Sequence, residues 1–345
     1  MKTRCGSIPS VKAAAYAALF FTGTLGCALP VFAATSGAAT TTVTQTLVTE
    51  PDQGLTPIYN LIQSAKSSID MTMYELVDTQ AQTLLDQAAE NGIKVRVILD
   101  QNLEKSNNTA AYNDLTSHGV QVVWAWTKYA ATHQKTITID NTTSAVMTLN
   151  LTSRYYSTTR DFAVIENDPA DVAAIESTFN ADFAAQSITP PLGDDLVWSP
   201  TVSATDLVNI INGAKTSLLV ENEEMSYSGV VTALENAAKR GVAVTVCMTN
   251  DDNDYETEFE ALTKAGVKVS TYPDNDTALY IHAKVILADY NTASAKAFVG
   301  SENFSSASLT ENRELGLVTT NAAVLTKLNS TITSDYAGGT PWTKS

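Results

Sequence analysis

The chain has little cysteine, histidine and positive charge, and each shortage limits what the protein can be. Only Cys247 lies in the body of the chain, inside the apolar run 242–248, which excludes an internal disulfide framework and predicts a small core residue. Only three histidines are present, so any histidine chemistry has few candidates. The chain has 21 basic and 37 acidic residues, and this net negative charge disfavours broad non-specific binding of nucleic acid.

Long hydrophobic runs are also lacking, with one exception at the N-terminus. Lys2, Arg4 and Lys12 precede the apolar stretch 13–32, and Val31-Phe32-Ala33 places small residues at a cleavage site. This layout predicts a signal peptide over residues 1–33, and therefore a secreted or periplasmic protein. Retention of the segment as a membrane anchor is the alternative. Its removal would leave a net charge of 18 − 37 = −19.

Residues 34–53 are rich in Thr, Ala and Ser. We predict a flexible leader there, or at most one edge strand, with folded sequence beginning near Leu55.

An internal repeat determines the predicted organisation of the chain. Two segment pairs match at an offset of 149 residues and a third at 147: 65–76 with 214–225, 88–99 with 237–248, and 115–123 with 262–270. Each copy reads as strand, helix, strand, helix, strand, with helix ends at Gly92 and Gly241. We therefore predict an α/β protein with two similar mixed-sheet halves, residues 54–190 and 191–345. The halves should be related by a pseudo-two-fold axis, with the site at their interface.

The stretch "YIHAKVILAD", residues 280–289, extends the repeat to chemically active residues. Its apolar side chains alternate as in a buried strand, while His282 and Lys284 share the opposite face. Two such groups in an apolar run cost free energy unless they are used. At the same offset of 149, "THQKTITID" places His133 on His282 and Lys135 on Lys284.

The repeat continues through a second set of polar residues. Asn150 matches Asn303, Thr148 matches Ser301, Asp161 matches Glu314, and Asp140 matches Asp289. Across the predicted axis, the motif histidines and lysines would form a pocket with the two asparagines, the two hydroxyls and the downstream acids Asp161 and Glu314. Lysine and amide N–H groups are donors that suit phosphate oxygens. One histidine could attack phosphorus while the other protonates the leaving oxygen, and lysine charge would make a metal unnecessary.

Two H-x-K-x4-D motifs in register, each followed by the matching asparagine and acid, resemble the phospholipase D superfamily from about Leu55 to Tyr336. The resemblance implies a phosphohistidine mechanism without cofactor or metal. It implies that His133 is the nucleophile and His282 the general acid, then base. It also implies that the lysines, the asparagines, Thr148 and Ser301 contact the phosphate. Glu314 would then orient His133, Asp161 would orient His282, and Asp140 and Asp289 would be structural.

One departure from the repeat affects the first half, where Met147 replaces the glycine found at Gly300. A glycine permits close backbone approach, so we expect a looser phosphate turn there. His118, at a helix end, is predicted to be structural.

Five aromatic residues flank the first motif and could either line a pocket or pack in the core: Trp124, Trp126, Tyr129, Tyr155 and Tyr156.

Three functions remain open from the sequence. The preferred one is a secreted, monomeric phospholipase D that hydrolyses phosphatidylcholine-like lipids or exchanges their head groups, with peripheral membrane contact. The others are a secreted metal-independent endonuclease of the same superfamily and a non-catalytic phosphate- or lipid-binding protein. The negative charge disfavours a polyanionic substrate, so nucleic acid is a partner only under the second.

Overall fold

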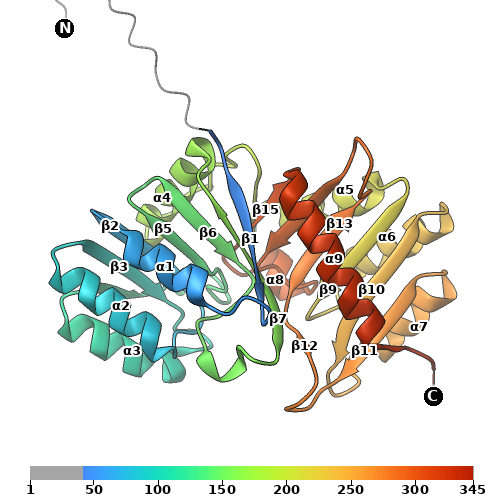
Figure 1. Ribbon diagram of the computed structural model, residues 1–345, viewed down its shortest axis with the longest axis horizontal. Helices are drawn as coiled ribbons and strands as arrows, with labels where there is room; N and C mark the ends of the chain where they lie inside the picture. Colours follow the sequence, from blue (N-terminus) through green and yellow to red (C-terminus); the bar gives the residue numbers. More distant parts are fainter. Residues whose placement is uncertain (1–41, 345) are drawn as a thin grey trace, which may run out of the picture. The chain divides into compact units, whose positions relative to one another are not determined.

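The β-branched runs that the sequence repeats form equivalent strands in two mixed sheets (Figure 1). The computed structural model describes residues 42–344. Each sheet has eight strands, in the orders β1-β7-β6-β5-β2-β3-β4, with β12 beside β7, and β16-β11-β10-β9-β13-β14-β15-β8. The predicted fold class, two similar α/β halves with mixed sheets, is confirmed. The predicted boundary at 190/191 falls between helix α4 and strand β8.

The first half contains β1 (Gln45–Glu50), α1 (Thr56–Ser64), β2 (Ser68–Met73), α2 (Thr79–Glu90), β3 (Lys94–Leu99), α3 (Lys105–Ser117), β4 (Gln121–Trp124), β5 (Thr136–Ile139), β6 (Thr143–Met147), the 3₁₀ turn η1 (Ser153–Tyr155), β7 (Thr159–Glu166) and α4 (Pro169–Phe183). The second half contains β8 (Leu196–Ser199), α5 (Ser203–Gly213), β9 (Ser217–Asn222), α6 (Ser228–Lys239), β10 (Ala243–Asn250), α7 (Glu256–Lys264), β11 (Lys268–Pro273), β12 (Tyr280–Ile281), β13 (Lys284–Ala288), β14 (Lys296–Gly300), α8 (Ser306–Thr310), β15 (Glu314–Thr319), α9 (Ala322–Gly338) and β16 (Thr340–Pro341).

Both sheets use the same pairing scheme. The first three strands of each repeat, β2-β3-β4 and β9-β10-β11, are parallel, as helical crossovers require. The following strands are antiparallel, and β5-β6-β7 corresponds to β13-β14-β15. The histidine, asparagine and acid of each motif therefore come from neighbouring segments of one sheet.

Residues 45–50 correct the prediction of a flexible leader over 34–53. They form edge strand β1, which pairs antiparallel with β7 and places Glu50 opposite Asp161. Leu47 and Val48 are buried, so apolar burial outweighs the polar composition that suggested a leader. The edge strand that the sequence left open is thus present, while residues 34–41 and the predicted signal peptide 1–33 lie outside the described residues.

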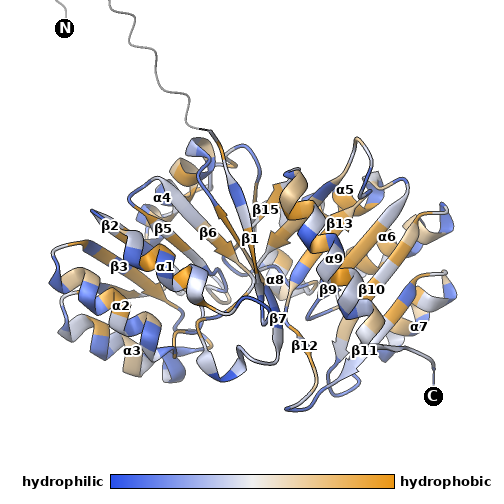
Figure 2. Ribbon diagram, in the orientation of Figure 1, coloured by the Kyte–Doolittle hydropathy of each residue, from blue (hydrophilic) through white to orange (hydrophobic). Residues whose placement is uncertain are grey.

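Four hydrophobic clusters are found among the described residues, and the three largest hold the layers together. Two lie between a sheet and its helices, one in each half, and Figure 2 shows the apolar strands that face them. The third core joins the halves, since it contains Phe162 and Val164 from β7 together with Val285 from β13 and Leu315 from β15. Cys247 is fully buried in this shared core, which confirms its prediction as a core residue.

The segment 280–289 is not one continuous strand. Tyr280 and Ile281 form β12, which pairs with β7 of the first sheet, and Lys284 begins β13 in the second sheet. His282 lies at the crossing point, and its backbone N–H donates to the Arg160 carbonyl at 3.2 Å. The first half does the same, because Thr132 bridges to Arg313 and the His133 N–H donates to the Arg313 carbonyl at 2.9 Å. Each half therefore fixes the other's histidine through the backbone.

The motif aspartates tie strand ends together. Asp289, at φ 53°, accepts hydrogen bonds from the backbone N–H groups of Lys215 and Thr216 at 2.9 and 2.7 Å, and from the Thr216 hydroxyl. Asp140, at φ 54°, makes the same contacts with Lys66 and Ser67. These bonds are what a structural role requires.

We expect Asp289→Asn to lower the free energy of unfolding by about 2 kcal/mol at pH 7. Burial alone would raise the pKa of Asp289, but the bonds from Thr216 and Lys215 lower it from 3.8 to about 2. A folded-state pKa below the unfolded value stabilises the fold above pH 4 and ceases to do so as pH falls towards 2. Denaturant titrations should therefore show that the difference in free energy of unfolding between wild type and Asp289→Asn becomes smaller as the pH falls from 4 to 2.

Asn tolerates the left-handed backbone, so Asp289→Asn removes the charge and the Oδ2 acceptor without straining the turn. Asp254→Asn, at an exposed position, is the control. A loss below about 0.5 kcal/mol at pH 7, within the range of ordinary surface substitutions, would show that the charge is not stabilising.

Within the described residues, no helix combines the length and the apolar character that crossing a bilayer requires.

Candidate active site

His133 is held by a carboxylate from the opposite half. Its Nδ1 lies 2.8 Å from Oε2 of Glu314, which is fully buried on β15. The other oxygen of Glu314 accepts hydrogen bonds from Ser308 Oγ at 2.6 Å and Asn312 Nδ2 at 3.0 Å. The carboxylate is therefore fixed on both sides before it reaches the ring.

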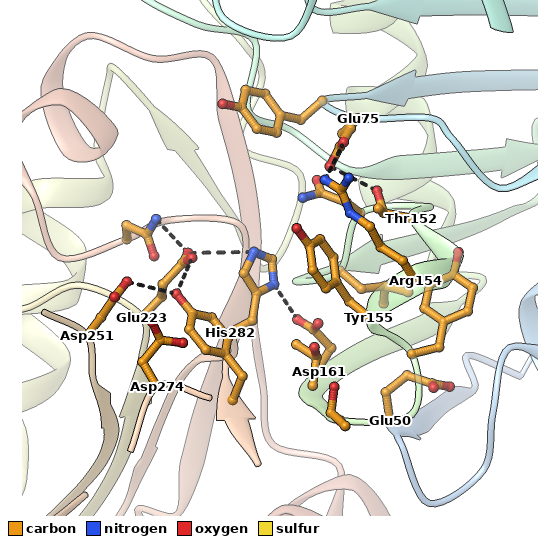
Figure 3. Close-up of a pocket in the computed structure, with 18 of the residues that line it drawn as sticks. Glu50, Glu75, Thr152, Arg154, Tyr155, Asp161, Glu223, Asp251, Asp274 and His282 are labelled. Carbon is orange, nitrogen blue, oxygen red and sulfur yellow. Dashed lines mark hydrogen bonds and ion pairs between the residues drawn. The ribbon is translucent and has the colours of Figure 1, made fainter. Parts of the chain in front are cut away.

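His282 has the reciprocal arrangement. Its Nδ1 lies 2.8 Å from Oδ1 of Asp161 on β7 (Figure 3). The same oxygen accepts from the Thr148 hydroxyl, which in turn accepts the Phe162 backbone N–H at 2.9 Å. The two histidines and the two downstream acids predicted from the sequence are thus brought together across the halves.

The protonation of His133 follows from its surroundings. Burial lowers the pKa of its imidazole, and the neighbouring Lys135 adds to this against the opposing effect of Glu314. Burial would raise the pKa of Glu314, but His133 outweighs it and the net shift is downward. An ionised carboxylate only accepts hydrogen bonds, so Nδ1 of His133 carries the proton and Nε2 keeps its lone pair.

The two motif lysines are fully buried behind the histidines. Lys135 Nζ donates to the His133 carbonyl at 2.7 Å and lies 4.9 Å from the centre of the Tyr74 ring. Lys284 Nζ donates to the His282 carbonyl and to Oε2 of Glu223, the latter at 2.9 Å. Burial and the neighbouring Lys284 lower the pKa of Lys135 to about 7, so an anion that binds beside it would favour its charged form.

Of the predicted phosphate-binding residues, the two fully buried motif lysines do not line the cavity, and the other four divide into two groups. Asn150 and Asn303 line the cavity, and each has a buried side-chain oxygen without a hydrogen-bond partner. Thr148 and Ser301 are fully buried and do not line it. Ser301 exchanges hydrogen bonds with the Leu315 backbone, so both hydroxyls face the strands rather than a ligand. The geometry therefore gives Thr148 and Ser301 a positioning role, in place of the phosphate contact expected for them.

His133 and His282 face one cavity of about 570 Å³. Its lining is strongly acidic, and Figure 3 shows several of these carboxylates around His282. Arg154 is the one lysine or arginine among the lining residues of the described chain. The acids are Glu50, Glu75, Glu104, Asp161, Glu223, Glu224, Asp251, Asp274 and Asp276.

Sequence reasoning missed several lining residues. Glu50 was assigned to the leader, yet β1 carries it to Asp161, and burial together with that neighbour raises the pKa of Glu50 to about 7. Glu223 and Tyr74 occupy equivalent positions after β9 and β2, and both lie against the motif residues. The sequence did contain a signal for this pair, because the aligned repeats have a neutral tyrosine at position 74 and an acidic glutamate at position 223.

The aromatic residues around the first motif also divide. Tyr155 and Tyr156 line the cavity. Trp124 stacks on Tyr112 with ring centres 4.4 Å apart, and Tyr129 is buried against Arg313. Pocket lining is therefore correct for the two tyrosines that follow the motif.

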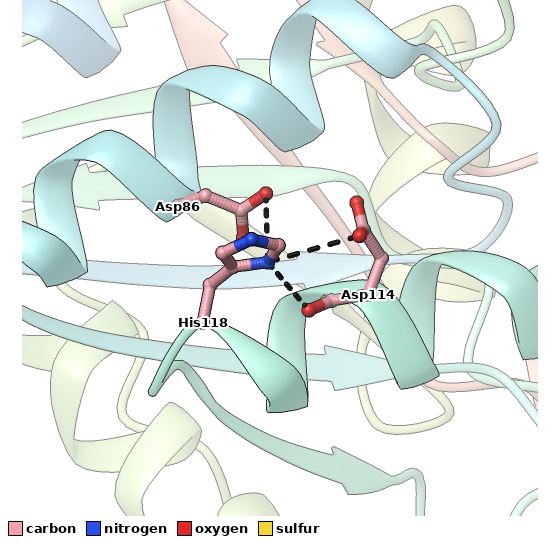
Figure 4. A group of neighbouring side chains, drawn as sticks. All are labelled: Asp86, Asp114 and His118. Atoms are coloured by element: carbon pink, nitrogen blue, oxygen red, sulfur yellow. Dashed lines mark hydrogen bonds and ion pairs between the residues drawn. The ribbon is translucent and has the colours of Figure 1, made fainter.

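Asp86, Asp114 and His118 form a second cluster, with ligand-type atoms within 4.8 Å of one another (Figure 4). The ring Nδ1 of His118 lies 2.9 Å from the backbone carbonyl of Asp114, one turn earlier in helix α3. This hydrogen bond and Asp86 raise the pKa of His118. The contacts fit the structural role predicted for this helix end.

The arrangement around His133 and His282 supports nucleophilic displacement. One imidazole offers a lone pair, a second faces it across the cavity, and both are oriented by carboxylates. Amide donors stand beside them. Such a set can transfer a phosphoryl-type group through a covalent histidine intermediate.

Residues 58–183 and 207–336 match the family described as "Cardiolipin synthase, PLD-like domain", one range in each half. An uncharacterized protein of Streptococcus mutans serotype c (strain ATCC 700610 / UA159) is 26% identical over 273 residues, which cover 66% of this chain and 56% of that relative. The chain thus spans little more than half the length of this relative.

Two solved structures share the fold. Polyphosphate kinase from Porphyromonas gingivalis has a TM-score of 0.65 at 14% identity, covering 85% of this chain and 50% of that one. Phosphatidylserine synthase from Haemophilus influenzae Rd KW20 has a TM-score of 0.64 at 12% identity, covering 84% of this chain and 85% of that one. At these identities the likeness shows a common architecture of paired halves.

Proposed function

This chain belongs to the family of PLD-like proteins, and we propose that it is a phospholipase D-type phosphodiesterase acting on phosphatidylcholine-like phospholipids. The observation that carries the proposal is the reciprocal pairing of His133 with Glu314 and of His282 with Asp161 around one cavity. The proposal includes transfer of the phosphatidyl group to an alcohol, because the same intermediate can react with water or with an alcohol.

The proposed reaction has two displacements at phosphorus. Nε2 of His133 forms a bond to phosphorus as the bond to the head-group oxygen breaks, and His282 gives its Nε2 proton to that oxygen. His282 then takes a proton from water, which attacks phosphorus and releases His133. Glu314 keeps the Nδ1 proton of His133 in place throughout.

The lining of the cavity supports the choice of substrate. Nine carboxylates and one arginine surround the space where a head group would sit, and Tyr155 and Tyr280 are also among the lining residues. This field repels a polyanion such as DNA and attracts a cation. A phosphodiester with an ammonium group fits both the phosphate donors and these acids.

A paired assay tests the proposal. Purified protein is given phosphatidylcholine vesicles or plasmid DNA, both with EDTA. Release of choline, and formation of phosphatidylethanol when ethanol is added, is the expected result. Nicked plasmid without choline release would instead show the nuclease, and activity in neither arm would leave a non-catalytic binding protein. Loss of choline release in EDTA would overturn the metal-free mechanism.

Export completes the proposal, since the predicted signal peptide would place a monomeric enzyme outside the cytoplasm. Release of mature chain beginning at Ala34 into the periplasm or medium is the expected observation.

A further inference from the structure

Glu223 occupies the position of an anionic ligand in the second half of the site. Its Oε2 accepts hydrogen bonds from Lys284 Nζ at 2.9 Å and Asn303 Nδ2 at 3.1 Å. The same oxygen lies 3.6 Å from Nε2 of His282, as Figure 3 shows. One carboxylate oxygen thus contacts the second-half lysine, asparagine and histidine that would serve the phosphate.

The first half has a neutral residue at the equivalent place. Tyr74 packs edge-on against His133, with ring centres 4.5 Å apart, and its face lies against Lys135. Within the described part of the chain, Lys135 forms no ion pair, whereas Lys284 pairs with Glu223. The two halves therefore share equivalent lysine and asparagine donors, but the residue next to these donors is neutral in the first half and negatively charged in the second.

A phosphate oxygen and the Glu223 carboxylate compete for the same donors. Both are anionic acceptors, and two such groups a few ångströms apart repel each other strongly in a buried site. The net pKa shift of Glu223 is strongly downward, since His282 and Lys284 outweigh the effect of burial, so the group is ionised. A phosphate can enter only if the carboxylate moves away.

The displaced carboxylate then needs a new partner. The Tyr280 hydroxyl already donates to Oε1 at 3.3 Å. Among the described lining residues the one lysine or arginine, Arg154, pairs with Glu75 at 3.4 Å, so no free cation stands beside Glu223. Glu223 is partly exposed to a cavity whose charged lining residues are mainly acids, so a ligand that brings its own cation to the displaced carboxylate has an advantage.

We propose that Glu223 determines specificity by yielding Lys284 and Asn303 to a phosphate only when the ligand places a cationic head group beside the displaced carboxylate. The residue thus selects zwitterionic phosphodiesters over anionic ones. This inference rests on the proposed function for its biological substrate, while its physical content concerns binding alone.

Binding of two soluble phosphomonoesters tests the inference without turnover. Phosphocholine carries the cation, glycerol 3-phosphate does not, and calorimetry gives both affinities. We expect wild type to prefer phosphocholine by about tenfold or more, and Glu223→Gln to tighten glycerol 3-phosphate binding about tenfold, so that the preference falls below about twofold. Glu223→Tyr, which installs the residue of the first half, should lose the preference too and serves as the second variant.

Glu235→Gln removes the same charge from helix α6, where Glu235 pairs with Lys239, and should behave as wild type. Equal affinity of wild type for both ligands, or a preference that Glu223→Gln leaves intact, would overturn the inference. The vesicle assay separates the two ideas: absence of choline release defeats the proposed function, whereas the calorimetric ratio alone decides the role of Glu223.

Discussion

Replacement of His133 by alanine is expected to reduce phosphodiester turnover by at least about 10⁴-fold. In the proposed mechanism this residue forms the bond to phosphorus, while His282, the other imidazole in the cavity, is protonated at that step and gives its proton to the leaving oxygen. His133 is oriented through Nδ1 by Glu314 and through its backbone by Arg313, so truncation removes a preorganised nucleophile. Initial rates of choline release from phosphatidylcholine measure the loss.

His282→Ala is the matched comparison, since it removes the partner histidine. With a substrate whose leaving group is p-nitrophenolate, departure needs no proton. The His282 variant should then release about one equivalent of p-nitrophenolate in a rapid burst and retain a phosphorylated histidine. The His133 variant should show neither. A burst in the His133 variant, or turnover within tenfold of wild type, would assign the nucleophile elsewhere.

Glu314→Gln is expected to reduce kcat by about 10³-fold or more. Ser308 and Asn312 both donate to Oε1, so a glutamine would place its carbonyl oxygen there and turn its amide NH₂ towards His133. The amide would donate to Nδ1 and force the imidazole proton onto Nε2, which removes the attacking lone pair. The tautomer can be read from the ¹⁵N chemical shifts of the ring.

Asp161→Asn provides the control, and the geometry predicts a much smaller effect. Thr148 and His282 both approach Oδ1 of Asp161, so an asparagine can place its carbonyl oxygen there and keep both contacts. We expect a loss of about tenfold from the missing charge. Equal losses in the two variants, with an unchanged His133 tautomer, would show that charge rather than tautomer control is what Glu314 supplies.

The repeat made much of the fold predictable, because equal offsets align equivalent strands without any knowledge of distances. The same offset of 149 also relates "LVTEP", residues 47–51, to "LVWSP", residues 196–200. These are strands β1 and β8, each at the edge of the antiparallel part of its sheet. The polar composition of the leader hid this match, since composition reports average solvation and not the pairing of one short segment.

The site was predictable in its residues but only partly in its contacts. Alignment of the internal repeats identified the histidine, lysine and asparagine that each half contributes. The pairing of His133 with Glu314 of the opposite half came from the family resemblance. The positions of Thr148 and Glu223 could not be obtained in this way. A hydroxyl bonds equally well to a strand or to a ligand, and only the packed sheet shows that Thr148 supports Asp161. Glu223 accepts hydrogen bonds from donors on separate segments of the chain, and only the folded structure brings those segments together.

The crossing of each motif segment into the opposite sheet limits how the two halves can move. β12 is hydrogen-bonded to β7, and Thr132 is bridged to Arg313, so both sides of the cavity are joined by backbone bonds that continue into a shared apolar core. A hinge opening between the halves would break these bonds and separate each histidine from its carboxylate. Under the proposed function, we therefore expect substrate entry and product release to depend on the loops that carry Glu104, Asp251 and Asp274 at the cavity, and turnover to be sensitive to the dynamics of those loops rather than to rigid-body motion of the halves.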